Sequence, residues 1–197
     1  MKFCNQCGSP LEMKIPPGDD RQRHVCTACE SVHYINPRII TGCVPAYEDG
    51  VLLCKRAIEP RKGYWTLPGG FLEKGESIAE GAVRETWEEA CAKVELHELY
   101  GVVDILHIGQ IYMFYRATLK TPEFSPGDES LETRLFKEDE IPWKEIAFPS
   151  ISWILKHYFN DARNGQFSLK TEKMDASVAI AKSDGGTDGV PKGAVHR

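Results

Sequence analysis

The sequence lacks any run of eighteen consecutive apolar residues, the shortest stretch expected of a membrane-spanning helix. Its first residues, MKFCNQCG, also lack the apolar core of a secretory signal peptide. We therefore expect a cytoplasmic protein without a membrane partner. An excess of positive charge is missing too, since 24 Lys and Arg stand against 29 Asp and Glu, which gives a net charge of −5. This balance does not indicate a nucleic-acid partner.

The overall composition of the chain is that of a globular protein. The chain has 197 residues, of which 42% are hydrophobic and 27% charged, and this suits one main domain with a small additional module. Beyond about residue 170 the chain is poor in large apolar residues and contains Gly-Gly and Lys-Gly pairs. We expect a small module over residues 1–36, a main domain over 37–168 and a disordered tail over 169–197.

The most informative segment runs from Gly69 to Ala92 and reads GGFLEKGESIAEGAVRETWEEACA. Ser77 and Glu80 have the spacing of a capping box, and no proline follows until the motif ends, so the segment predicts a glycine loop and then a helix over 78–90. At about 100° per residue, three carboxylates share one stripe of this helix, namely Glu85, Glu88 and Glu89. The opposite face is predicted to be buried and consists of Ala79, Val83, Thr86, Trp87, Ala90 and Val94.

The crowding of the three carboxylates needs a physical explanation. Like charges three or four residues apart destabilise a helix by about 0.2 to 0.5 kcal/mol per pair. A hard cation such as Mg²⁺ would compensate, because it binds one or two carboxylates together with substrate phosphates and water. The alternative is a solvated acidic face that Arg84 balances. The glycine loop before the helix favours the metal site.

The same segment resembles the signature of the Nudix hydrolases, G-x5-E-x7-R-E-U-x-E-E-x-G-U, where U is bulky and apolar. The matching positions are Gly70, Glu76, Arg84, Glu85, Glu88 and Glu89. Three positions differ: Thr86 and Ala92 replace bulky apolar residues, and Cys91 replaces a glycine. Because that glycine would allow a left-handed turn out of the helix, Cys91 leaves the exit geometry open.

The resemblance implies the Nudix α/β/α sandwich with a mixed sheet, in the α/β class, and a metal-dependent hydrolysis of diphosphates. The carbonyl of Gly69 would be one ligand of catalytic Mg²⁺ or Mn²⁺. The side chains that would bind metal or activate water are Glu85, Glu88 and Glu89. Bound metal would lower the pKa of a water molecule and neutralise charge on the phosphoryl oxygens.

The family pattern also implies supporting roles. Arg84 would orient Glu85 through a charge-assisted hydrogen bond, and Glu76 would brace the glycine loop. The spacing does not identify the general base. Glu129 and Glu132, in a downstream acidic segment, are candidates, and an exposed acidic loop is the alternative for both.

A second pattern lies at the N-terminus, where Cys4-x2-Cys7 and Cys26-x2-Cys29 stand eighteen residues apart. Tetrahedral Zn²⁺ takes four soft ligands, and each Cys-x-x-Cys turn offers two thiolates, so we expect a structural zinc ribbon. Disulfides are rare in the cytosol, and a redox pair would not explain the second copy. About 35 residues bury little apolar surface, so zinc would supply much of the folding energy.

Hydrophobic patterning places the remaining elements. An Asp-Gly turn joins two strands in a hairpin, and helical spacing of Ile151, Ile154, Leu155 and Tyr158 predicts a second helix over 150–160. The expected strands lie at 39–47, 51–56, 95–103, 108–119 and 132–136.

Substrate choice depends on residues outside the motif. Tyr64, Trp65, Tyr112, Phe114 and Phe148 are able to stack on an adenine or a flavin, although packing in the core is the alternative for most of them. We take Tyr64 and Trp65, with Glu129 and Glu132, as the candidate substrate-binding residues.

A zinc ribbon joined to a Nudix domain is similar to the NADH pyrophosphatases, but their SQPWPFPxS element is absent after the motif. The chain more closely resembles zinc-ribbon Nudix proteins of the ADP-ribose and FAD pyrophosphatase type, over about residues 1–170.

These observations predict hydrolysis of the diphosphate bond in a nucleoside diphosphate derivative. ADP-ribose or FAD is favoured, and AMP and a phosphorylated moiety would be released. One alternative is an NADH or NAD-cap pyrophosphatase, and another is a zinc-ribbon regulator that binds nucleic acid or senses nucleotides. The expected partner is a small-molecule nucleotide, and a homodimer is left open.

Overall fold

The computed structural model describes residues 1–175, and the chain divides into two compact units between Pro37 and Arg38. Most of the expected disordered tail, residues 176–197, lies outside the described residues. No helix within residues 1–175 is long and apolar enough to cross a membrane.

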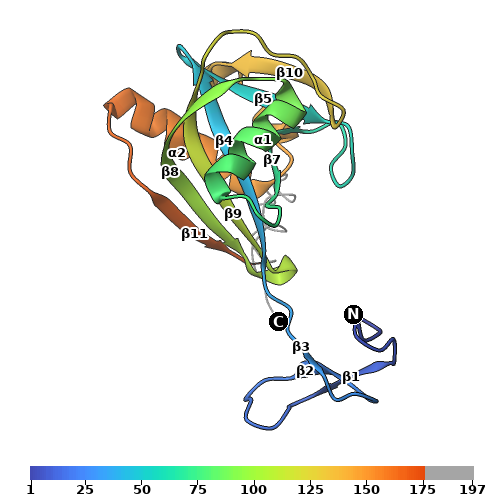
Figure 1. Ribbon diagram of the computed structural model, residues 1–197. Helices are drawn as coiled ribbons and strands as arrows, with labels where there is room; N and C mark the ends of the chain where they lie inside the picture. The colour runs from blue at the N-terminus through green and yellow to red at the C-terminus, as the bar shows by residue number, and fades with distance from the viewer. Residues whose placement is uncertain (176–197) are drawn as a thin grey trace, which may run out of the picture. The chain divides into compact units, whose positions relative to one another are not determined.

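The N-terminal unit is a small antiparallel sheet in the order β1-β2-β3 (Figure 1). Its strands are β1 (Leu11–Lys14), β2 (Arg23–Cys26) and β3 (Val32–His33). Few side chains of this unit are buried, and they are Cys4, Pro16, Val25, Cys26 and His33. So small a core contributes little burial energy, which agrees with a unit that is held together by its cysteines.

The second unit is built on one mixed sheet with the strand order β10-β5-β4-β9-β8-β11. The strand pairs β4–β9 and β8–β11 are parallel and the other neighbours are antiparallel. Short strands β6 and β7 pair with β5 and β4. The strand bounds are β4 (Arg38–Tyr47), β5 (Gly50–Arg56), β6 (Trp65–Thr66), β7 (Gly69–Phe71), β8 (Val94–Ile105), β9 (Gln110–Leu119), β10 (Ser130–Phe136) and β11 (Lys170–Met174).

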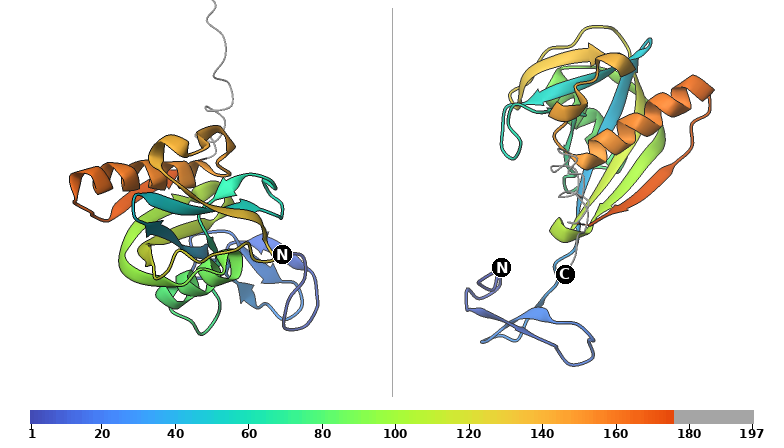
Figure 2. Two further views of the ribbon diagram at one scale, coloured as in Figure 1. Left: turned by 90° about the horizontal axis from the view of Figure 1, so that it is seen from above. Right: turned by 180° about the vertical axis from the view of Figure 1, so that it is seen from behind.

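The predicted hairpin is confirmed, because β4 and β5 pair across the turn with Ala46 opposite Val51 and Tyr47 opposite Gly50. Residues 50–54 of β5 are all buried, as expected of a strand that is covered on both faces. The covering layers are α1 (Ile78–Ala90) and α2 (Pro149–Asn164), which lie on opposite sides of the sheet (Figure 2). The expected α/β/α sandwich with a mixed sheet is therefore present. Short 3-10 turns occupy Leu106–Ile108, Glu138–Glu140 and Trp143–Glu145.

Helix α1 begins as predicted but buries a different face. The capping box is present, since Ser77 Oγ accepts from the Glu80 N–H at 3.2 Å and Glu80 Oε2 accepts from the Ser77 N–H at 2.8 Å. The predicted buried face is wrong at Val83 and Trp87, which are 38% and 50% exposed. The side of α1 that is buried holds Gly81, Ala82, Glu85, Thr86, Glu89 and Ala90.

The reason for this rotation is the close approach of α1 to β4. A Cβ atom on Gly81 would lie 2.7 Å from Thr41 Cγ2, so only glycine fits there. Small residues therefore face the sheet, and the larger Val83 and Trp87 are turned outward. Two of the three glutamates consequently point inward as well.

Strand β11 corrects the expectation that the tail starts at residue 169. Residues 170–174 form a parallel strand on β8, with Lys170 opposite Gly101 and Met174 opposite Ile105. Lys170 Nζ lies 2.8 Å from a carboxylate oxygen of the buried Asp161, which also accepts from the Tyr100 hydroxyl at 3.1 Å. These polar contacts hold residues 170–174 against the sheet, although their mostly polar sequence is typical of a loop.

Candidate active site

The glycine loop brings the backbone of β7 against the carboxylates of α1. Gly69 and Gly70 pair with Gly42 and Thr41 of β4. A Cβ atom on Gly70 would lie 2.5 Å from both carboxylate oxygens of Glu85. The absence of a side chain at residue 70 therefore creates the space that the Glu85 carboxylate occupies.

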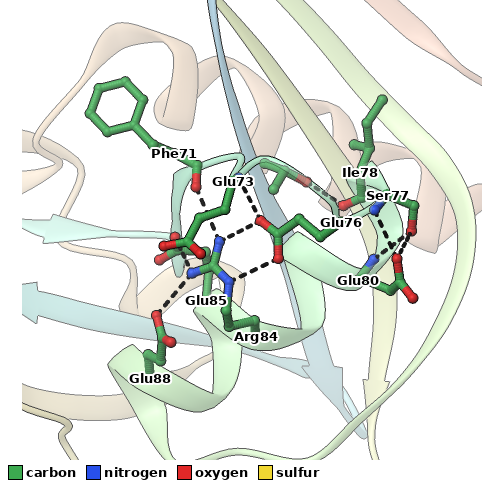
Figure 3. A network of polar contacts seen from close by, with 10 residues as sticks. Phe71, Glu73, Glu76, Ser77, Ile78, Glu80, Arg84, Glu85 and Glu88 are labelled. Carbon is green, nitrogen blue, oxygen red and sulfur yellow. Dashed lines mark hydrogen bonds and ion pairs between the residues drawn. The ribbon is translucent and has the colours of Figure 1, made fainter.

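Arg84 connects the loop to the carboxylate stripe (Figure 3). Its Nη2 and Nε donate to the two oxygens of Glu76 at 2.6 and 3.0 Å. Its Nη1 donates to Glu85 at 2.8 Å and to Glu88 at 2.9 Å, and Nη2 also reaches the carbonyl of Phe71 at 3.1 Å. The hydrogen bonds from Arg84 lower the pKa of Glu76 to about 2. One guanidinium thus fixes the loop and two glutamates in a single network.

The three glutamates differ in their surroundings. Glu85 and Glu89 are only 9% and 7% exposed, whereas the Glu88 side chain is 53% exposed. Glu89 Oε2 accepts one hydrogen bond from the Gly69 N–H at 3.0 Å. Burial raises the pKa of Glu89 to about 8, and burial likewise raises the pKa of Glu85 against the opposing effect of Arg84.

Glu85 and Glu89 therefore do not belong to a solvated acidic face, which was the alternative to a metal site. Paired, inward-facing carboxylates beside a cavity are oxygen donors of the type that Mg²⁺ or Mn²⁺ takes. A bound cation would favour their charged forms, which burial otherwise disfavours. The donor set thus fits a divalent cation.

The carboxylates face a cavity of about 1220 Å³, which is larger than the ~300 to 1,000 Å³ of ordinary ligand sites. Its walls combine the stripe and glycine loop with a second group of side chains from β5, β9 and the start of α2. Members of this second group are Arg56, Tyr112, Phe114, Phe148 and Ser150. The site is thus acidic on one wall, whereas another wall is aromatic and includes Arg56; Arg61 lines the cavity as well.

Of the two candidate bases, the structure brings only Glu129 to this cavity. Burial is the main cause of the raised pKa values of Glu85 and Glu89, and the negative charge of Glu129 adds to both. The loop before Glu129 is attached to the end of α1, because the Gly127 N–H donates to the Glu89 carbonyl at 3.1 Å. Glu132 instead lies on β10, 3.8 Å from Lys55 Nζ.

The four predicted zinc ligands converge in the N-terminal unit. Their sulfur atoms lie within 4.8 Å of one another, and three of the sulfur–sulfur distances are 3.4 Å for Cys7–Cys26, 3.5 Å for Cys7–Cys29 and 3.8 Å for Cys4–Cys29. Sulfurs bound to one tetrahedral zinc at about 2.3 Å would be about 3.8 Å apart. Backbone N–H groups of Ala28 and Cys29 donate to Cys26 Sγ at 3.4 Å. The cluster therefore has the geometry of a structural Cys4 zinc site.

Residues 36–157 match the profile of the NUDIX domain, and residues 2–35 match that of the Nudix N-terminal zinc ribbon. The chain belongs to the Nudix hydrolase family. A Nudix hydrolase from Nitrosomonas europaea, solved as a crystal structure, is 50% identical with a TM-score of 0.86, and the match covers 89% of this chain and 99% of that one.

Among the curated relatives of this Nudix hydrolase, two kinds of name state a substrate. The ADP-ribose pyrophosphatase of Methanocaldococcus jannaschii is 30% identical over 58% of this chain and 69% of its own length. An NAD-capped RNA hydrolase, NudC, from Salmonella schwarzengrund is 32% identical over 72% of this chain and 53% of its own length. The chain thus spans between about half and two thirds of these relatives.

Neither aromatic residue chosen from the sequence lines the cavity of this Nudix hydrolase. Trp65 is buried in the core, with its ring 4.8 Å from that of Phe136 at an angle of 80°. Tyr64 is half-buried and stacks under the Arg61 guanidinium at 5.3 Å. Trp65 therefore matches the packing alternative.

Cys91 resolves the open question about the end of α1. It adopts φ 47° and ψ 27°, and its N–H donates to the Trp87 carbonyl at 2.8 Å. The chain therefore makes the left-handed turn that a glycine would favour, although a side chain is present.

Arg56 and Ser150 are among the polar residues of the cavity that the sequence did not indicate. Arg56 ends β5 and Ser150 lies in the first turn of α2, and both line the site. No local motif marks either residue. Their involvement follows only from the sheet topology, which brings the end of β5 near the start of α2.

Proposed function

We propose that this Nudix hydrolase cleaves the diphosphate bond of a nucleoside diphosphate derivative in a reaction that depends on Mg²⁺ or Mn²⁺. ADP-ribose or FAD is the favoured substrate, and the products are AMP and a phosphorylated moiety. The inward-facing carboxylates of Glu85 and Glu89, beside Glu88 at the wall of a cavity of about 1220 Å³, carry this proposal. The likeness to the ADP-ribose pyrophosphatase of Methanocaldococcus jannaschii supports the substrate class.

The three glutamates would hold the ions, with the carbonyl of Gly69 as a further ligand. When bound, the ions supply an activated water and neutralise charge on the diphosphate. Arg84 keeps Glu85 and Glu88 in position, and the Gly69 N–H does the same for Glu89. We assign to Glu129 the role of accepting a proton from the attacking water, because it faces the stripe from a separate loop.

Zn²⁺ bound by Cys4, Cys7, Cys26 and Cys29 would hold the N-terminal unit in its fold. Four reduced thiolates suit a reducing compartment, so we place the protein in the cytoplasm.

The proposal is tested by a substrate panel of FAD, ADP-ribose, NADH, diadenosine polyphosphates and nucleoside triphosphates with Mg²⁺. We expect ADP-ribose or FAD to give the highest kcat/KM. The substitutions Glu88→Gln and Glu89→Gln should each lower kcat by about 10²-fold or more, since even supporting residues of metal sites cost 10- to 100-fold. Glu132→Gln, an acidic residue outside the cavity, is the control. An unchanged kcat in Glu89→Gln would contradict the assignment of Glu89 as a metal ligand.

NAD-capped RNA is a second candidate substrate, because a relative of that name matches 72% of this chain. The chemistry would be the same diphosphate cleavage with a macromolecular leaving group. Comparing kcat/KM for an NAD-capped oligonucleotide with that for ADP-ribose decides between them. A preference for the capped oligonucleotide that weakens as salt rises would establish the second candidate.

A further inference from the structure

His33 reaches the cysteine cluster of the N-terminal unit although it belongs to neither Cys-x-x-Cys pair. Its Nε2 atom lies 3.3 Å from the sulfur of Cys4. Both side chains are buried, with 9% of His33 and 4% of Cys4 exposed. An imidazole N–H is a donor and a thiolate is an acceptor, so this contact is able to form a hydrogen bond. The ring is therefore placed to act on a bound metal through one of its four sulfur ligands.

The charge of the cluster makes such donors important. Four thiolates outweigh the charge of one Zn²⁺, so the zinc-loaded cluster is an anion. Burial disfavours an anion unless hydrogen-bond donors surround it. The sulfurs differ in their access to water. Cys7 and Cys29 are exposed, whereas Cys4 and Cys26 are buried. The two buried sulfurs therefore depend on donors from the protein.

The two buried sulfurs obtain their donors in different ways. Cys26 Sγ accepts from two backbone N–H groups of the turn that follows it, both at 3.4 Å. Cys4 Sγ accepts from one backbone N–H, that of Gln6 at 3.4 Å, and the His33 ring is the next donor within reach. The ring of His33 thus occupies at Cys4 the place that a second backbone N–H occupies at Cys26.

A second histidine provides an internal comparison. His24 on β2 lies directly opposite His33 on β3 in the antiparallel pair, and it is half-buried. Among residues 1–175, however, His24 makes no hydrogen bond with a cysteine sulfur. The two rings therefore have similar places in the small sheet and differ in their contact with Cys4.

We propose that His33 is a positioning residue of the zinc site and donates its Nε2–H to the Cys4 thiolate. The inference rests on the proposed zinc site and adds to it a residue outside both cysteine pairs. The hydrogen bond fixes the orientation of the Cys4 side chain and withdraws part of its negative charge, as partners of metal ligands commonly do. Unlike a backbone donor, the ring is removable by substitution, so its contribution is measurable.

The zinc affinity of the full chain tests this assignment. Competition with a chromophoric chelator, under reducing conditions and in excess Mg²⁺, gives the dissociation constant of zinc. His33→Phe keeps a ring without a donor and should weaken zinc binding by about 10- to 100-fold. His33→Gln should keep part of the affinity, because its amide N–H is a donor at a reach similar to that of Nε2. His24→Phe is the matched control and should bind zinc like the wild type.

Spectroscopy separates a hydrogen bond from mere packing of the ring. A hydrogen bond lowers the energy of the sulfur lone pair. In the Co²⁺-substituted protein, its loss should therefore move the sulfur-to-cobalt charge-transfer band to longer wavelength in His33→Phe and not in His24→Phe. ¹⁵N NMR of the zinc-loaded wild type needs no variant and should show the ring hydrogen of His33 on Nε2. This measurement carries the test if His33→Phe fails to fold.

The outcomes distinguish the role of His33 from the zinc site itself. Wild-type zinc affinity in His33→Phe, or an Nε2 atom without a hydrogen in the zinc-loaded protein, would overturn the role. Direct ligation of the metal by His33 would also overturn it, and would appear as ¹¹³Cd–¹⁵N coupling in the cadmium-loaded protein. If the wild type binds no zinc, the proposed zinc site fails and the role of His33 fails with it. If the wild type and all three variants bind zinc equally, the zinc site stands and the role of His33 alone fails.

Discussion

Replacing Gly70 with alanine should separate catalysis from folding. The added Cβ would lie 2.5 Å from both Glu85 oxygens, whereas ordinary contacts begin at 3.4 Å. The carboxylate must therefore retreat by the difference, 0.9 Å. Because the displaced atoms end a side chain, the free energy of unfolding should change by less than about 1 kcal/mol. A displacement of about 1 Å at a reacting group costs about 10²-fold in rate, so kcat/KM should fall by that factor.

The assay measures kcat/KM for ADP-ribose at saturating Mg²⁺ together with the midpoint of thermal unfolding. Gly50→Ala is the control, since a Cβ there would meet its nearest atoms at an ordinary 3.6 Å and the residue lies outside the cavity. The reasoning is refuted if Gly70→Ala keeps wild-type kcat/KM. It is also refuted if the loss of activity is matched by a large loss of stability, because the loop itself would then have been disturbed.

Three further predictions concern the C-terminal end of α1, the ion pair of Glu76 with Arg84, and the N-terminal cysteine cluster. Cys91→Gly should raise the free energy of unfolding in urea by about 0.5 to 1 kcal/mol, because a left-handed conformation costs a residue with a side chain about 1 to 2 kcal/mol; a decrease would contradict this. The pKa of Glu76 falls from 4.5 to about 2 in the folded state, so its contribution to stability is present above pH 4.5 and is lost as the pH drops toward 2; Glu76→Gln should flatten that part of an acid-denaturation curve. Metal analysis should return about one zinc per chain in the wild type and in Cys91→Ser and none in Cys26→Ser, and retained zinc in Cys26→Ser would disprove the Cys4 site.

Sequence reasoning succeeded where structure depends on neighbours along the chain. The Ser77–Glu80 box set the start of α1, the Asp-Gly turn set the β4–β5 hairpin, and both are local hydrogen-bond patterns. The cysteine spacing likewise foretold the cluster, because each Cys-x-x-Cys turn is built locally.

Sequence reasoning failed where contacts between distant segments of the chain determine the structure. Helical periodicity assumes that charge points outward, so it placed Val83 and Trp87 inside, whereas Gly69 and Arg84 supply the partners that let glutamates turn inward. Strand β11 was missed because its sequence is mostly polar and its partners lie on β8 and α2. Arg56 was missed for the same reason, since it becomes part of the site only through tertiary structure.

At the proposed metal site, the inward turn of Glu85 and Glu89 would also make the stability of the folded state depend on divalent ions. An ion that binds only the folded chain adds about 2.7 kcal/mol of stability when its concentration is 100 times its dissociation constant. The solvent-exposed Glu88 alone would give the chain little such dependence. The melting temperature of this protein should therefore report ion occupancy directly, and a melting curve recorded against Mg²⁺ or Mn²⁺ concentration would rank the two ions before any substrate has been identified.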